Sequence, residues 1–300
     1  TLVHNCHVVS AKGGMYLEFL DMLDKARVIG LTATPFRLAT NSFGSELRFL
    51  TRTSPRIFSD VVHYTQIGDL VAHGYWAPLH YDEVSVLRSE RLHLNSTGAD
   101  YTDKSVQLEF AEVGFVSRLR DEVERQLDSG RRNVLVFTRF VDESERLAKS
   151  VPGTAVVTAE TPAGERARII GDYKRGKIRC VTNVGVIALG FDYPELECVI
   201  LGRPTVSLAL YYQMVGRCVR PHAQKAYAQV VDLVGLVKQF GHVEDFELRP
   251  GGASGKQWII HGGGKQLTNI YFSARDAVDP AAQKAQRNRR FWAQKAIARR

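Results

Sequence analysis

Four short apolar runs, separated by helical patterns, constrain the fold of this chain most strongly. The runs are "VLVF" at 134–137, "KIRCVTNV" at 177–184, "CVILG" at 198–202 and "AQVVDLVG" at 228–235. Strands with few polar positions are buried on both faces, which is typical of a parallel sheet covered by helices. The alternation over 106–248 therefore predicts an α/β unit with a parallel sheet, whose ligands bind at the carboxyl ends of its strands.

Helical patterns fill the intervals between these runs. Apolar residues at helical spacing predict helices over 106–129, 141–150 and 208–219. Another helix is predicted between Thr161 and Gly176, because Pro162 suits a first turn and glycine a helix end. A short strand, "TAVVTA", is predicted between the helices at 141–150 and 161–176, so strands and helices alternate along this part of the chain, as a parallel sheet requires.

A polar stretch, "SERLHLNSTGADYTDKS", divides the chain at 89–105. Such a composition is typical of an interdomain linker. We expect residues 1–82 to form the C-terminal part of a first lobe, 83–105 a linker and 106–248 a complete second lobe. Residues 249–300 then form a glycine-rich segment, interpreted as a flexible connection and not as a phosphate loop, and a basic tail.

Composition excludes several classes of protein. The chain has 300 residues, is 44% apolar and contains no run of about eighteen apolar residues, so we expect no membrane span and a cytoplasmic location. Its four cysteines form no C-x-x-C pair, which argues against a zinc ribbon or a disulfide framework, and no metal site is predicted. The first residue is Thr1 and no export signal follows, so we expect the sequence to begin inside a longer protein.

The net charge of +8 is concentrated in the tail. Residues 281–300 hold seven Lys and Arg side chains and no acid, interleaved with Phe291 and Trp292. Cations beside aromatic rings suit contact with a nucleic-acid strand. The alternative is a solvated helix whose apolar side packs on the body of the protein, and both interpretations can hold together.

The pattern Q-x-x-G-R-x-x-R is formed by Gln213, Arg217 and Arg220. On a helix, residues three or four apart share a face, so two guanidinium groups would lie side by side. Planar forks of N–H donors suit the terminal phosphates of a nucleotide. Taken alone, the pattern also fits a solvated basic face.

Two strand-to-loop patterns precede it. "LTATPFR" at 31–37 ends a strand in the hydroxyls of Thr32 and Thr34, and "TNVGVIALGFD" at 182–192 runs into a glycine-spaced loop with an acid. In this order the three patterns resemble motifs III, V and VI of superfamily 2 helicases. The stretch at 46–81 resembles the RadD-like bacterial and phage DNA helicases.

This resemblance implies two RecA-like lobes, ATP with Mg²⁺ as cofactors, and action on DNA, including DNA repair. In the family, the positions of Gly190 and Asp192 lie near the ribose and phosphates. Those of Gln213, Arg217 and Arg220 face the γ-phosphate and the attacking water.

The resemblance also implies contacts with a nucleic-acid strand, most simply DNA. Thr32 and Thr34 match the motif that couples nucleotide state to nucleic-acid binding. Hydroxyl, amide and guanidinium donors at strand ends suit contacts to the phosphate backbone. The residues in this predicted group are Thr138, Arg139, Thr158, Thr182 and Asn183.

The chain departs from the family at two places. No G-x-x-x-x-G-K-[ST] phosphate loop occurs, so this loop is expected in an upstream segment or a separate polypeptide, or it is lost. Where the family has Asp-Glu-x-His, this chain has His4, Asn5, Cys6 and His7. Imidazole is a poor Mg²⁺ ligand and an amide cannot act as a base, so ATP turnover by this chain alone should be near background.

Two functions therefore stay open. One is most of a DNA helicase or translocase that lacks its phosphate loop. The other is a catalytically inactive remnant that binds nucleic acid or a protein. A displaced alignment at His4 and Asn5, or a fault in the first residues, would also account for the departure.

Overall fold

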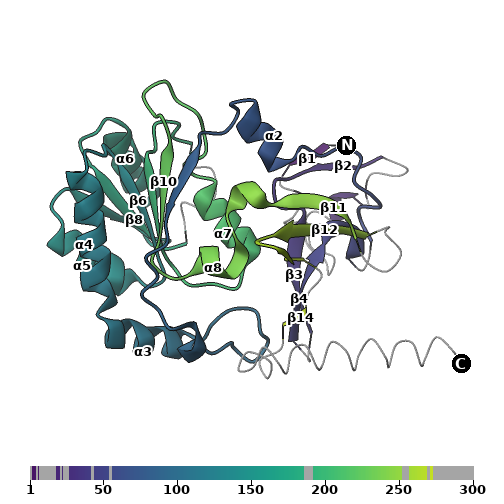
Figure 1. Cartoon of the computed structure of the whole chain (residues 1–300), viewed down its shortest axis with the longest axis horizontal. Coiled ribbons are helices and arrows are strands. Elements are labelled where there is room, and N and C mark those ends of the chain that lie inside the picture. Colours follow the sequence, from purple (N-terminus) through teal and green to yellow (C-terminus); the bar gives the residue numbers. More distant parts are fainter. Residues whose placement is uncertain are drawn as a thin grey trace, which may run out of the picture.

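The computed structural model describes residues 2–4, 6, 18–20, 22, 27–41, 44–53, 56–185, 192–251, 257–268 and 271–272. These residues form two bodies that lie side by side in Figure 1, with helices α7 and α8 between them. The larger body is a sheet covered by helices, and the smaller contains the first strands of the chain. The predicted basic tail lies outside the described residues.

The larger body is built on a six-stranded sheet in which every pair of neighbours is parallel. In spatial order the strands are β5 (Leu79–Asp82), β10 (Ala228–Asp232), β9 (Cys198–Gly202), β6 (Val134–Thr138), β8 (Cys180–Asn183) and β7 (Thr154–Val157). Every residue of the four central strands is buried, as near-continuous apolar runs require. The predicted parallel α/β fold is confirmed.

Helices cover both faces of this sheet, with α4, α5 and α6 on one side and α7 and α8 on the other in Figure 1. Their bounds are α3 Asp103–Val113, α4 Phe115–Asp128, α5 Val141–Ser150, α6 Ala163–Lys174, α7 Leu208–Val215 and α8 Leu236–Phe240. The single helix predicted over 106–129 is wrong. Gly114 adopts a φ of 61°, in the left-handed region that ends a helix, and separates α3 from α4.

The smaller body contains short sheets of mixed direction. Strand β1 (Leu2–His4) pairs in parallel with β2 (Ile29–Leu31). Two further sheets are antiparallel: β14 (Tyr271–Phe272), β4 (Gly44–Phe49) and β3 (Phe36–Asn41), and β11 (Glu247–Gly251), β12 (Gln257–Gly262) and β13 (Lys265–Gln266). Helix α2 and three 3₁₀ turns complete the described elements, at Ile67–Ala72, Leu50–Arg52, Ser89–Arg91 and Val243–Asp245.

The expectation of a flexible connection beyond residue 248 is wrong for the described part of that segment, which forms strands β11, β12 and β13. Gly263 and Gly264, with φ of 54° and 74°, form the two-residue turn between β12 and β13. A turn with two positive φ angles matches the twist of an antiparallel pair, which explains the glycines.

The segment from β5 to α3 packs on the larger body. Strand β5 pairs with β10, and Thr102 caps α3 by accepting a hydrogen bond from Ser105 N (3.3 Å). The boundaries predicted at residues 82 and 105 stay predictions. Within the described residues, no helix is long and apolar enough to cross a membrane, and Cys6, Cys180, Cys198 and Cys218 are buried thiols without disulfide bonds.

Candidate functional site

Helix α7 leads into the turn that carries the two predicted arginines. Ser207 caps its start by accepting a hydrogen bond from Leu210 N (3.2 Å). The helix ends at Val215, where Arg217 N donates to Met214 O (3.3 Å), a tightened i to i+3 bond. The prediction of one helix through Val219, with both guanidinium groups on a helical face, is therefore wrong.

The structure nevertheless brings Arg217, Arg220 and Asp192 together. Arg220 Nη1 lies 3.1 Å from Asp192 Oδ2, and both side chains are more than half exposed. Arg217 is half-buried and its Nε donates to Gln213 O (3.1 Å). Burial lowers the pKa of Arg217, the charge of Arg220 lowers it further, and Asp192 opposes both. Two adjacent cations with one acid form a site that an anionic ligand can neutralise.

Of the other residues of the predicted nucleotide site, the structure describes some and not others. Gln213 is half-buried in α7, next to the arginine turn. Asp192 lies in the loop that leads into β9. Gly190 lies outside the described residues, as do Asn5, His7 and the side chain of His4.

Polar side chains at the ends of β6 and β8 are hydrogen-bonded within the protein, to Ser144 of α5 and to backbone carbonyls. Ser144 Oγ lies 2.6 Å from Thr138 Oγ1 and 2.8 Å from Thr182 Oγ1. Asn183 Nδ2 donates to the carbonyl of Val136 (3.2 Å). Thr138, Thr182 and Asn183 are at most 1% exposed. A direct phosphate contact by these three would require them to leave their partners. In this structure Thr138 and Thr182 fix α5 to the sheet, and Asn183 joins β8 to β6.

The hydrogen-bonding groups of Thr158 are also paired with neighbouring residues. Its backbone N–H donates to Thr161 Oγ1 (2.9 Å), and its hydroxyl accepts from Glu160 N (3.2 Å). Both bonds belong to the turn that leads from β7 into α6, where threonine hydroxyls commonly replace backbone partners.

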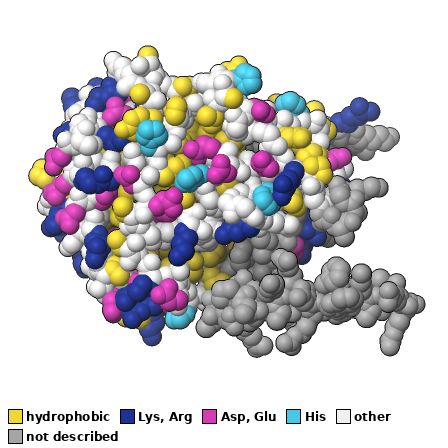
Figure 2. All heavy atoms as spheres, in the orientation of Figure 1, with side chains coloured by type: hydrophobic (Ala, Val, Ile, Leu, Met, Phe, Trp, Pro, Cys, Tyr) yellow, Lys and Arg dark blue, Asp and Glu magenta, His cyan; other side chains and the backbone are white. Residues whose placement is uncertain are grey.

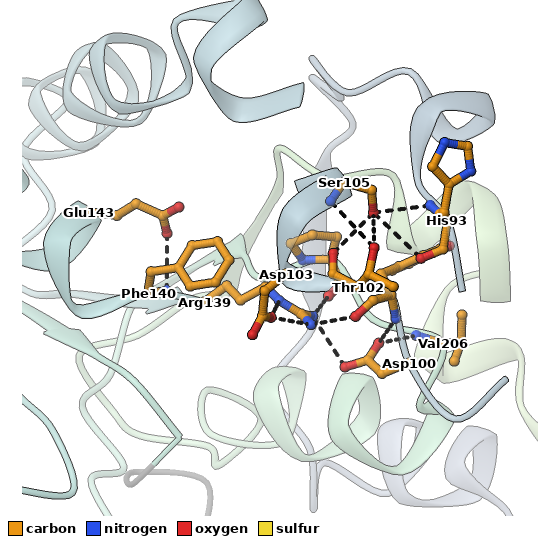
Figure 3. Close-up of polar contacts among 11 residues, drawn as sticks. His93, Asp100, Thr102, Asp103, Ser105, Arg139, Phe140, Glu143 and Val206 are labelled. Carbon is orange, nitrogen blue, oxygen red and sulfur yellow. Dashed lines mark hydrogen bonds and ion pairs between the residues drawn. The ribbon is translucent and has the colours of Figure 1, made fainter. Parts of the chain in front are cut away.

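Arg139 joins the end of β6 to Asp100, Tyr101 and Asp103 around the start of α3. This set of contacts, the Arg139 lock, is shown in Figure 3. The guanidinium of Arg139 donates to Asp103 Oδ1 (3.0 and 2.9 Å), to Asp100 Oδ2 (3.2 Å) and to the carbonyls of Tyr101 (2.7 Å) and Pro204 (3.2 Å). All five N–H donors of the fork are thus used within the protein. The predicted phosphate contact by Arg139 would compete with these bonds.

Two titratable side chains near this edge of the sheet were missed by sequence reasoning. Arg203 follows β9 directly, its pKa is lowered by burial, and its buried Nε has no hydrogen-bond partner among the described residues. Its place after an apolar strand is the same signal that selected Thr138. Glu143 is buried, its pKa is raised to about 7 by that burial, and it accepts from Phe140 N (3.3 Å); no sequence signal marks it.

A cavity of about 500 Å³ separates the smaller body from α7. Thr32, Gln66, Tyr212 and Phe246 are among its lining residues. Thr32 Oγ1 accepts from Thr34 N (3.0 Å), so the two predicted coupling threonines are joined. The cavity therefore faces both the Thr32 strand end and α7, although Arg217 and Arg220 do not line it.

The donor set for Mg²⁺ is not found among the residues that the structure describes. No group of three or more His, Cys, Asp or Glu side chains there is placed to hold a metal ion. The chemistry of His4 and Asn5 also does not suit Mg²⁺.

Comparison with protein families matches residues 116–222 to the helicase conserved C-terminal domain. A "51.5 kDa protein" of a Lactococcus phage (isolate 7-9) is 26% identical over 227 residues, which cover 74% of this chain and 46% of that protein. A "Putative ATP-dependent helicase IRC3" of Saccharomyces cerevisiae is 38% identical over 82 residues, 27% of this chain and 12% of that protein. The chain thus spans less than half the length of these curated relatives.

The solved structures support the same fold. "The fragment structure of a putative HsdR subunit of a type I restriction enzyme from Vibrio vulnificus YJ016" matches with a TM-score of 0.56 and 20% identity, over 75% of this chain and 42% of that one. The helicase C-terminal domain matched at residues 116–222 contains β6 to β9, α7 and the arginine turn. Residues 116–222 therefore carry a helicase C-terminal domain, and the likeness in fold extends over 75% of the chain.

Proposed function

We propose that this chain is most of an ATP-dependent DNA helicase or translocase of superfamily 2. The observation that carries the proposal is the convergence of Arg217, Arg220 and Asp192 beside α7. In the complete protein, the two guanidinium groups bind the terminal phosphates of ATP and neutralise the charge that develops during phosphoryl transfer. Closure of the two lobes on ATP then moves the protein along a strand.

The phosphate loop and the Mg²⁺ ligands come from outside this sequence in this proposal, either from an upstream segment or from a separate polypeptide. Nothing in the 300 residues matches the loop, and His4 and Asn5 do not suit Mg²⁺. The residues of this chain therefore supply the half of the site that binds and neutralises phosphate charge.

The nucleic-acid contact is the second part of the proposal. On the face in Figure 2, basic and acidic side chains alternate over the larger body, so cations are not gathered there. Arg203 and the arginines of residues 281–300 supply the donors for a phosphate backbone instead. DNA is preferred over RNA on the resemblance to RadD-like helicases.

The test is an ATPase assay with single-stranded DNA, Mg²⁺ and the purified 300-residue chain, repeated with the natural upstream residues restored. We expect activity near background for the chain alone and DNA-stimulated activity for the longer protein. In the longer protein, Arg217→Ala should lower kcat by about 10³-fold, because it removes a cation from the developing charge. Strong activity of the 300-residue chain alone would contradict the proposal, because it would show that His4 and Asn5 at the positions of the usual acids do not prevent hydrolysis.

A catalytically inactive binding protein is the second candidate, favoured by His4 and Asn5 at the positions of the usual acids. It predicts that the longer protein binds DNA but hydrolyses no ATP. The same assay therefore separates the two functions.

A further inference from the structure

Lys225 carries a buried ammonium that the proposed reaction does not use directly. The residue is 6% exposed. Its Nζ donates to three backbone carbonyls, those of Pro194 (2.7 Å), Leu196 (3.0 Å) and Cys218 (2.9 Å). Because an ammonium has three N–H donors, this set satisfies it completely.

The three carbonyls belong to two separate segments of the candidate site. Pro194 and Leu196 lie in the loop that contains Asp192 and leads into β9. Cys218 lies in the turn between Arg217 and Arg220. One buried ammonium thus joins the segment of the acid to the segment of the two arginines, in addition to the exposed ion pair of Asp192 and Arg220.

The chemistry of this position requires lysine. Three acceptors converge on one nitrogen atom, whereas the donors of an arginine are spread over a planar fork. Burial lowers the pKa of Lys225, and the charges of Glu195 and Glu197 act in the opposite direction. Backbone dipoles alone bond the ammonium, so its loss would leave buried carbonyls of both segments without a donor.

We propose that Lys225 is a positioning residue that holds the arginine turn against the Asp192 loop and so sets the grip of Arg217 and Arg220 on a polyphosphate. This inference rests on the proposed function. It adds a residue outside the Q-x-x-G-R-x-x-R pattern to the phosphate site.

The test uses the full 300-residue chain and inorganic triphosphate as the probe. Binding is followed by NMR through the side-chain Nε–H signal of Arg217, which titration can follow even for weak affinities. Lys225→Met keeps the aliphatic stem and removes the ammonium. We expect the Kd for triphosphate to rise about tenfold, which corresponds to about 1.4 kcal/mol of binding free energy.

Two control variants make the result specific. Lys238→Met removes one exposed charge from α8 in the same lobe, so it matches the loss of net charge and should leave the Kd within about twofold. Arg217→Ala, followed through the signal of Arg220, should abolish most triphosphate binding. In the double variant of Arg217 and Lys225, the second change should add little, because positioning acts through the arginines.

The outcomes separate the two proposals. If Arg217→Ala binds triphosphate like the wild type, the proposed function fails and this inference fails with it. If Arg217→Ala loses binding but Lys225→Met does not, only the inference is overturned.

If Lys225→Met does not fold, Lys225→Arg is used with hydrogen exchange. The amides of 192–197 and 216–221 should then exchange faster together, because a planar guanidinium cannot direct one nitrogen atom at all three carbonyls. Faster exchange in one segment alone would overturn the inference.

Discussion

The parallel sheet of the larger body and the parallel pair β1–β2 of the smaller body have similar sequences and opposite environments. In β9, Ile200 and Leu201 are 0% exposed. In β2, Ile29 and Leu31 are 51% and 44% exposed. The same residue types thus form a core in one region and a surface in the other.

This difference shows where strands are covered on both faces. The strands of the larger body have helices on both faces, and their apolar side chains belong to one large cluster, which also takes in Phe36, Leu47 and Phe49 of the smaller body. In the smaller body, a separate cluster contains Val3, Cys6 and Leu50, with a few half-buried neighbours. Fully burying a Leu or Ile side chain contributes about 1.5–3 kcal/mol, so the larger body should dominate the free energy of unfolding.

The largest expected effect comes from the same substitution made in both sheets. Leu201→Ala should lower the free energy of unfolding by about 2–5 kcal/mol, because it leaves a cavity in a packed core. Leu31→Ala should cost less than about 1 kcal/mol, because the side chain is half exposed. Urea unfolding followed by circular dichroism measures both, and equal losses would contradict the comparison.

A smaller effect is expected at the Arg139 lock. Arg139→Ala leaves the Oδ2 atom of Asp100 and two backbone carbonyls without their donor, and should cost about 2 kcal/mol. Arg146→Ala is the matched control, since Arg146 pairs with Asp142 at 2.9 Å on an exposed helix face. It should cost about 0–1 kcal/mol.

Hydrogen exchange locates the effect of the lock. The amides of residues 100–103 should exchange faster in Arg139→Ala, and their exchange rates should stay unchanged in Arg146→Ala. Unchanged exchange at 100–103 in both variants would show that Arg139 does not hold this segment.

The smallest expected effect is a pH dependence of opposite sign in the two bodies. Burial raises the pKa of Glu143 to about 7, so its ionisation opposes folding and stability falls as pH rises from about 4.5 through 7. The hydrogen bond from Trp258 lowers the pKa of Asp60, so any contribution there is lost as pH falls through the acid range. Glu143→Gln should therefore gain stability relative to the wild type as pH rises from 4.5 to 8, measured by urea unfolding. A constant difference across that range would contradict the assignment.

The larger body was predictable because its signals are local and strong. Runs such as "CVILG" at 198–202 permit few environments besides a sheet that is buried on both faces. The break at Gly114 was missed because a glycine inside a helical pattern also fits an uninterrupted helix. The turn at Gly263 and Gly264 was missed because glycine clusters mark loops and hairpins alike.

The candidate site was predictable only in outline. The motif order identified Asp192, Arg217 and Arg220, which the fold brings together. It did not show that Thr138, Thr182 and Arg139 are engaged inside the protein, because hydrogen-bond partners come from distant segments. Lys225 carries no motif signal at all, since its three acceptors are backbone carbonyls that any sequence possesses.

The contact of Gln66 with Leu248 has a consequence for motion. Gln66 Nε2 donates to Leu248 O (2.8 Å), and Leu248 N donates to Gln66 Oε1 (3.0 Å), so one amide side chain continues β11 like an added strand residue. The chain also passes from α2 into β5 close by in sequence. The chain passes between the two bodies twice, from α2 into β5 and from the turn Val243–Asp245 into β11, and this contact joins the two passages on the side of the smaller body. A movement of one body against the other would therefore have to change the backbone at both passages together.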